Sequence, residues 1–398
     1  MGTTHKNWLV AGGIFLCVIG GAAIAISRSR SIVISAIHPA TEASSTASIA
    51  TSSITTAKTI AATANNTEAQ QIAAVEDPFV PLMPLTPLDQ AVYNAKMLAI
   101  ANIPILSRRI SPTSTIFVTS TAPSLWPVKI APYPNAGAIL PFKRIVAYYG
   151  NLYSTQMGVL GQYPPAQVMQ MLASATAEWA AADPTTPVVP ALDYITVTAQ
   201  ASAGADGKYR LRMPDDQVDK ILNMAAPVND LVFLDVQVGL SNVETEVPLL
   251  EKYLKMPQVE LALDPEFDMH NGARPGTVIG TMDAADINFA AQYLAKLVRE
   301  NNLPPKILVI HRFTDPMVTH TSAITPLPEV QIVMDMDGFG NPAKKINTYQ
   351  RTIVSQPVQF TGFKLFYHND STPSIGGHLM SPQEVLKLSP QPSYIQYE

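Results

Sequence analysis

Short apolar, β-rich runs recur through the chain from Lys143 onward, and segments with helical spacing separate them. Several runs are continuous stretches of Val, Ile, Leu and Phe, which is typical of parallel strands buried on both faces. Eight runs are predicted as strands: Ile145–Gly150, Tyr194–Ala199, Leu231–Val238, Val259–Leu263, Ile307–Ile310, Val330–Met334, Phe363–Tyr367 and Tyr394–Tyr397.

The segments between these runs carry helix signals. Asp283 is placed to cap the helix that follows it, with Asp286 at the third helical position. Only the segment Thr314–Glu329 has little helical character. The other predicted helices are Pro165–Ala182, Asp216–Met224, Val243–Leu254, Pro342–Val354 and Pro382–Leu388.

Alternation of eight strands with helices predicts an α/β fold of the (β/α)8 TIM-barrel class over residues 143–398. No eighth helix follows the last strand, and residues 87–101 are a candidate to fill that gap from the N-terminal side. An open doubly wound sheet is the alternative. It is less favoured because no glycine-rich phosphate loop follows the first strand.

The N-terminal part is predicted to anchor and tether the barrel. Trp8–Ile26 is an uncharged, mostly apolar stretch long enough for a transmembrane helix, and a cleaved signal peptide is the competing interpretation. We therefore expect residues 1–30 to form a membrane anchor or signal segment and residues 31–85 a linker rich in Ser, Thr and Ala, then Pro. Residues 86–142 would be an extension that packs on the barrel, which would lie outside the cytoplasm.

Composition excludes several classes of function. Charged residues make up 14% of the chain and the net charge is −5, so no basic surface for nucleic acid is expected. Cys17 is the only cysteine, which excludes an intramolecular disulfide and a cysteine-based zinc site. Walker, Rossmann, His-Glu-x-x-His and Gly-x-Ser-x-Gly motifs are absent, and no cofactor or metal is expected.

Polar and acidic residues gather where the predicted strands end. In a TIM barrel the carboxyl ends of the strands form the mouth that holds the active site. Side chains alternate along a strand, so we expect Asp264 and Glu266 at the end of the fourth strand to point to the same side. Pro265 donates no ladder hydrogen bond, so regular strand pairing is expected to stop there. Turn formation is the competing explanation for any one of these residues. The strand ends supply Tyr149, Asn151, Gln200, Asp235, Gln237, Asp264, Glu266, His311, Asp335, Asp337, His368, Asp370, Gln396 and Glu398.

The run Leu-Asp-Pro-Glu-Phe at residues 263–267 resembles the Asp-x-Glu strand ending of chitinase-like enzymes and Chalaropsis-type lysozymes. The stretch from Leu261 to Tyr349 is also similar to uncharacterised bacterial cell-surface proteins of the glycoside-hydrolase-like TIM-barrel superfamily. The chain has Glu260 and Ala262 where the chitinase-like pattern has further aspartates. This resemblance implies two-carboxylate cleavage of a cell-wall or surface polysaccharide, such as a peptidoglycan-like ligand.

Cleavage of a glycosidic bond needs one acid and a second carboxylate on the opposite side. We expect Glu266 to be the general acid and Asp264 to stabilise positive charge. The nucleophile or base is expected among Asp235, Asp335 and Asp337. The residues expected to bind the sugar are Tyr149, Asn151, Gln237, His311, His368, Phe267 and Phe339.

Two rival functions remain open. The barrel is a candidate for a non-catalytic module that binds a glycan or cell-wall component, since a fold does not fix a function. The other rival is a metal-dependent hydrolase that uses His311, His368 and some of Asp264, Asp335 and Asp337.

Overall fold

A computed structural model describes residues 85–103, 105–111, 114–119, 125–129 and 131–398. The predicted membrane segment Trp8–Ile26 and nearly all of the predicted linker lie outside these residues. No helix in the described part of the chain is both long and apolar enough to cross a membrane.

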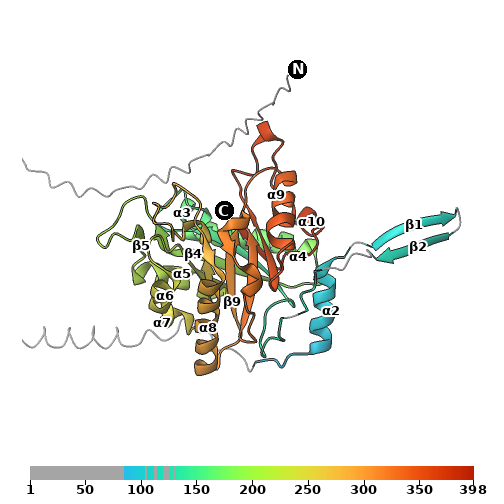
Figure 1. Ribbon diagram of the computed structural model, residues 1–398, viewed down its shortest axis with the longest axis horizontal. Helices are drawn as coiled ribbons and strands as arrows, with labels where there is room; N and C mark the ends of the chain where they lie inside the picture. The colour runs from blue at the N-terminus through green and yellow to red at the C-terminus, as the bar shows by residue number, and fades with distance from the viewer. Residues whose placement is uncertain (1–84, 104, 112–113, 120–124, 130) are drawn as a thin grey trace, which may run out of the picture. The chain divides into compact units, whose positions relative to one another are not determined.

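Eight parallel strands close into a barrel surrounded by helices (Figure 1). Each strand pairs with the next one along the barrel, and β13 pairs with β3 to close the ring. The fold is therefore the predicted (β/α)8 barrel, and each of the eight predicted runs overlaps one strand. The strands are β3 (Arg144–Gly150), β4 (Val188–Ala199), β6 (Leu231–Val236), β7 (Val259–Leu263), β9 (Lys306–Arg312), β11 (Val330–Met336), β12 (Phe360–Leu365) and β13 (Tyr394–Tyr397).

Most predicted helices are confirmed, with altered ends. The predicted helix Val243–Leu254 is instead three short pieces, with Pro248 in the middle one. The helices outside the barrel are α3 (Val159–Gln162), α4 (Pro165–Ala182), α5 (Asp215–Ala225), α6 (Val243–Glu246), α7 (Glu251–Leu254), α8 (Ala284–Asn301), α9 (Pro342–Thr348) and α10 (Pro382–Val385). The π-helix η6 (Tyr349–Val354) continues α9.

The segment Thr314–Glu329 contains no α-helix, as predicted, but only the short turns η4 (Asp315–Met317) and η5 (Thr321–Ala323) around β10 (Val318–Thr319). The other short elements are β5 (Arg210–Arg212), β8 (Met282–Asp283), η1 (Ala226–Val228), η2 (Val247–Leu250), η3 (Pro265–Phe267) and η7 (Pro373–Ile375). Strands β1 (Ile105–Ser111) and β2 (Ser114–Thr119) form an antiparallel hairpin.

Helix α8, one of the two longest in the ring, shows how the sequence specifies these elements. Asp283 and Asp286 form the predicted capping box, in which each side chain accepts a backbone hydrogen bond from the other end of the first turn. Ile287, Leu294 and Val298 are buried on the face turned to the barrel, as their spacing predicts.

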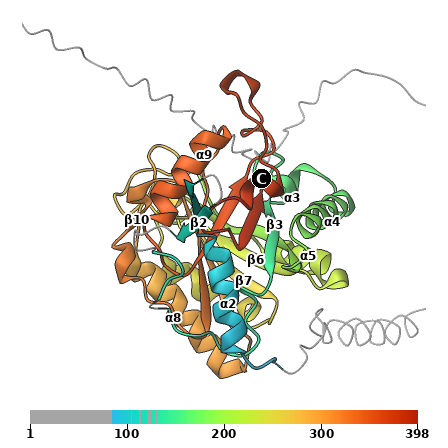
Figure 2. The ribbon, with the colours of Figure 1, turned by 90° about the vertical axis from the view of Figure 1, so that its right-hand side faces the viewer.

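Helix α2 (Gln90–Ala101) has a different place from the one predicted. Tyr93 and Met97 on this helix are buried and belong to the same cluster as Ile145, Phe233 and Ile307, which point into the barrel near the strand beginnings. Figure 2 shows α2 in the centre of the view, with α4, α5, α8 and α9 around it. The helix therefore closes the floor of the barrel and does not stand in as an eighth helix of the ring.

Candidate functional site

The barrel interior changes from apolar to charged along its axis. The lower layer consists of apolar side chains, whereas the next inward positions toward the carboxyl ends are polar. Strand alternation therefore brings together side chains that are far apart in sequence. This upper layer contains Tyr149, Asp193, Asp235, Asp264, His311, Asp335, Lys364 and Gln396.

His311 lies at the centre of the layer between two aspartates. Its Nε2 is 3.1 Å from Asp235 Oδ2 and its Nδ1 is 3.1 Å from Asp335 Oδ2. All three side chains are fully buried. Burial opposes the charged imidazole, but the hydrogen bonds to the two aspartates outweigh it and raise the pKa of His311 well above its ordinary value. An imidazolium donates from both nitrogens and so provides one hydrogen bond to each carboxylate.

A glycine on the neighbouring strand makes room for this arrangement. A Cβ added to Gly362 would lie 2.4 Å from Asp335 Oδ1, closer than any side chain can approach. The absence of a side chain at this inward position of β12 therefore allows Asp335 to reach His311.

Asp193 extends the buried network across the barrel. Its Oδ2 accepts hydrogen bonds from the Tyr394 hydroxyl at 2.6 Å and from Gln396 Nε2 at 2.8 Å. Burial, helped by the nearby charge of Asp235, raises the pKa of Asp193 to about 7. Asp193 is not among the predicted site residues, because the predicted strand starts at Tyr194, whereas β4 begins at Val188 and tolerates Pro190.

A second set of charged side chains, centred on Lys364, lies above His311 and its two aspartates. Lys364 Nζ is 3.2 Å from Asp337 Oδ1 and 2.8 Å from Glu398 Oε2, and it lies 3.8 Å from the centre of the Tyr149 ring. Burial would lower the pKa of Lys364, but Asp337 and Glu398 outweigh it and raise this pKa. Burial also raises the pKa of Asp337 to about 6, although Lys364 and His311 oppose that change. A lysine within an otherwise apolar strand was the sequence signal that could have identified Lys364.

Glu266 does not share a strand face with Asp264, which corrects the prediction. Strand β7 ends at Leu263, and Asp264 caps the 3₁₀ turn η3, in which Glu266 lies. Asp264 Oδ1 accepts the Glu266 backbone N–H at 3.3 Å, and its Oδ2 accepts Gln237 Nε2 at 3.2 Å. Asp264 thus positions the turn that carries Glu266.

The Glu266 side chain is half-buried at the mouth. No described side chain forms a hydrogen bond or ion pair with its carboxyl group. Burial and the charges of Asp264 and Asp337 raise the pKa of Glu266 well above its ordinary value. Among the described acids of the upper barrel, Glu266 is therefore the one whose carboxyl group no protein side chain engages.

Gln237 and Tyr149 connect these groups. Gln237 Nε2 lies 3.3 Å from the Tyr149 hydroxyl as well as near Asp264, and its Oε1 accepts the Ala199 backbone N–H. The ring of Tyr149 also meets His311 edge to face, with ring centres 6.0 Å apart. Both predicted sugar-binding residues are buried and hold the network together.

Other predicted site residues lie apart from this network. Asn151 is buried and hydrogen-bonds the Ile195 carbonyl and the Tyr153 backbone N–H, so it shapes a loop. His368 is exposed and pairs with Gln162. Phe339 packs edge to face on Phe366 and is 40% exposed, and Phe267 is half-buried in η3.

The metal-hydrolase arrangement predicted from His311 and His368 does not form. His368 is not in the buried network, and both ring nitrogens of His311 already face aspartate oxygens. Asp370, another strand-end acid, forms an ion pair with Lys345 at 2.7 Å and accepts two backbone N–H groups, which indicates a structural role.

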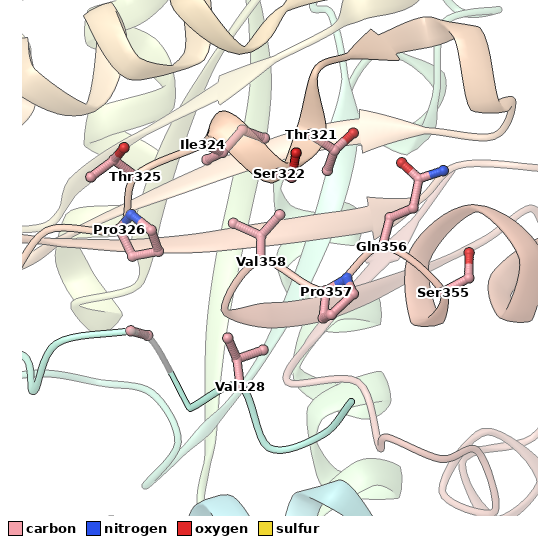
Figure 3. Close-up of a pocket in the computed structure, with 11 residues that line it drawn as sticks. Val128, Thr321, Ser322, Ile324, Thr325, Pro326, Ser355, Gln356, Pro357 and Val358 are labelled. Carbon is pink, nitrogen blue, oxygen red and sulfur yellow. The ribbon is translucent and has the colours of Figure 1, made fainter. Parts of the chain in front are cut away.

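A surface hollow of about 640 Å³ lies away from the acidic network. It is lined by Thr321, Ser322, Ile324–Pro326, Ser355–Val358, Val128 and Ala131 (Figure 3). All of these side chains are uncharged, so the hollow supplies no acid or base.

No protein-family model and no curated protein matches this chain. Among solved structures, a GH5-4 broad-specificity endoglucanase from an uncultured bovine rumen ciliate is similar at 10% identity and a TM-score of 0.30. The match covers 52% of this chain and 72% of that one. An HPPK-DHPS structure in complex with substrates matches at 10% identity and a TM-score of 0.31, over 67% of this chain and 50% of that one. Similarity at this level carries no argument about function.

Proposed function

We propose that this barrel hydrolyses glycosidic bonds of a polysaccharide, with Glu266 as the general acid. One geometric observation carries the proposal. A carboxyl group that no described side chain pairs with or hydrogen-bonds lies at the carboxyl-terminal mouth of a TIM barrel, where such enzymes place their reactive groups. Its neighbours include a second carboxylate, as two-carboxylate hydrolysis requires.

The second carboxylate is best assigned to Asp337. Asp235 and Asp335, the other predicted candidates, are fully buried and bound to His311, so they cannot contact a sugar without disrupting that pair. Asp337 keeps 8% of its side chain exposed, and Lys364 holds it in place. We assign Asp337 as nucleophile or base, and Asp264 as the residue that positions Glu266.

The mouth also offers surfaces suited to sugar rings. Phe339 follows β11 and is 40% exposed, and Tyr153 follows β3 and is 61% exposed. Exposed aromatic side chains provide apolar contact area for a carbohydrate. The predicted segment at Trp8–Ile26 would place the barrel on the outer side of a membrane, so a cell-wall or surface polysaccharide is the proposed substrate.

Replacement of Glu266 tests this function. The full-length chain in mild detergent is incubated with peptidoglycan, chitin and a β-glucan, and new reducing ends are measured. E266Q should lower the rate by about 1000-fold, because a general acid contributes roughly 10²–10⁴-fold. E300Q, which changes an exposed glutamate on α8, is the matched control and should retain the wild-type rate. Equal rates for E266Q and wild type would remove Glu266 from the acid role.

A glycan-binding barrel without catalysis is the second candidate. The observation that favours it is the internal pairing of most acids in the upper barrel, through His311 and Lys364. Tight binding of one of these polysaccharides by wild-type protein, with no new reducing ends after prolonged incubation, would support this candidate over the enzyme.

A further inference from the structure

Three potential metal ligands meet behind the turn that carries Glu266. Asp268 directly follows η3, His270 lies in the loop after it, and Asp286 is in the first turn of α8. One ligand atom from each residue lies within 4.8 Å of those from the other two. The acidic network inside the barrel uses none of these side chains.

Asp268 is the informative member of this group. It is 1% exposed, and neither of its carboxylate oxygens accepts a well-formed hydrogen bond from the described residues; the facing side chain is His270, whose Nε2 lies 3.3 Å from Asp268 Oδ1. A buried carboxylate without hydrogen bonds is strongly unfavourable unless a positive charge compensates it. A cation bound next to Asp268 would therefore compensate the charge of this carboxylate.

The distances are compatible with an ion shared by the three side chains. His270 Nε2 lies 3.3 Å from Asp268 Oδ1 and 3.4 Å from Asp286 Oδ2. Both separations exceed the usual N–H···O length of about 2.9 Å. They agree with the spacing of roughly 3.3 Å between neighbouring ligands of a tetrahedral ion bound at about 2.0–2.1 Å.

We propose that Asp268, His270 and Asp286 bind a divalent transition-metal ion, with Zn²⁺ as the preferred ion. One imidazole and two carboxylates suit Zn²⁺ better than Ca²⁺, which takes oxygen ligands. The capping box orients Asp286, because the Asp283 backbone N–H donates to its Oδ2 at 2.9 Å. The His270 side chain is 51% exposed, which gives the ion a way in from solvent.

Such an ion would join the loop after η3 to the first turn of α8. The Thr281 backbone N–H already donates a hydrogen bond to the Asp268 carbonyl, and the Gly280 N–H donates one to the Glu266 carbonyl. The ion would thus stabilise the segment next to Glu266. This inference does not depend on whether Glu266 cleaves glycans.

Calorimetric titration of the full-length chain with ZnCl₂ at pH 7.5, after removal of metals with a chelator, tests the site. Wild type should bind Zn²⁺ at one site, more tightly than Ca²⁺, and H270A should weaken this binding at least tenfold. H378A is the matched control, since His378 is 55% exposed and faces a single carboxylate, that of Glu384. It should bind Zn²⁺ like wild type.

A second variant and a second measurement distinguish loss of the metal site from misfolding of the protein. D286N keeps the side-chain volume and should also weaken Zn²⁺ binding at least tenfold. Zn²⁺ should raise the thermal unfolding midpoint of wild type and of H378A but not that of H270A. Wild-type protein that binds no Zn²⁺, variants that bind it as tightly as wild type, or tighter binding of Ca²⁺ would each overturn the proposal.

Discussion

The buried aspartates of the upper barrel differ in the groups that stabilise their negative charge. Asp235 and Asp335 share the imidazolium of His311, whereas among the described residues Asp193 receives hydrogen bonds only from the neutral groups of Tyr394 and Gln396. A buried carboxyl with neutral donors favours its protonated form more than one paired with a cation. Asp193 is therefore one member of the network whose ionisation should oppose folding.

Loss of this carboxyl should flatten the pH dependence of stability. The pKa of Asp193 is raised to about 7, from an ordinary value near 3.8. Its stabilising contribution is complete below about pH 4 and is lost as the pH rises through 7. At about 1.4 kcal/mol per pKa unit the loss amounts to a few kcal/mol. D193N should lose less stability than wild type between pH 4 and 8, as measured by urea unfolding.

Asp206 provides the contrast for this experiment. The hydrogen bond from Arg210 lowers the pKa of this exposed carboxyl, so D206N should not reduce the loss of stability on going from pH 4 to 8. An unchanged slope in D193N would show that Asp193 ionises freely in the folded chain.

The ion pair of Asp337 with Lys364 predicts how kcat/KM depends on pH. If Asp337 is the second carboxylate, kcat/KM should rise as the pH passes through about 6, where Asp337 ionises. K364M removes the positive charge 3.2 Å away, so the pKa of Asp337 should rise. The rise of kcat/KM with pH, which is the acidic limb of the pH–rate profile, should then move to higher pH. K296M, on the exposed face of α8, should leave the limb in place. A limb that does not move in a folded K364M protein would exclude Asp337.

At the scale of elements, the sequence predicted which segments are helices and strands better than where some of them pack. Residues 87–101 were a candidate to fill the place of the eighth ring helix, yet α2 closes the barrel floor. Its apolar residues surround the helix instead of forming one stripe, so the sequence does not show which face is buried. Pro265 ended β7 as predicted, but the turn that follows redirects Glu266 in a way that strand alternation cannot foresee.

The floor position of α2 predicts its mutational pattern. Met97 is 5% exposed within the interior cluster, so M97A should destabilise the chain by about 2–5 kcal/mol. Leu98 is the next residue on the same helix and is 61% exposed, so L98A should change stability by less than about 0.5 kcal/mol. Similar losses for the two variants in urea unfolding would contradict the role of α2 as the floor.

At the scale of the whole molecule, the strand–helix alternation was enough to predict the closed barrel and the acidic character of its mouth. The sequence did not predict which charged side chains pair with one another, because these pairs form only when the ring of strands closes. His311 on β9 meets Asp235 on β6 and Asp335 on β11, and Lys364 on β12 meets Asp337. Charges far apart in sequence thus compensate one another inside the barrel, which leaves Glu266 facing the mouth.

Hydrolysis in water enriched in ¹⁸O tests the central claim most directly. Full-length wild-type protein is incubated with peptidoglycan, chitin or β-glucan in H₂¹⁸O, and the products are analysed by mass spectrometry. We expect one ¹⁸O atom at each new reducing end from wild type, and almost no labelled product from E266Q. The absence of labelled ends from wild type with all three polysaccharides, or equal labelling by E266Q, would contradict the assignment of Glu266 as the acid of a glycan-cleaving barrel.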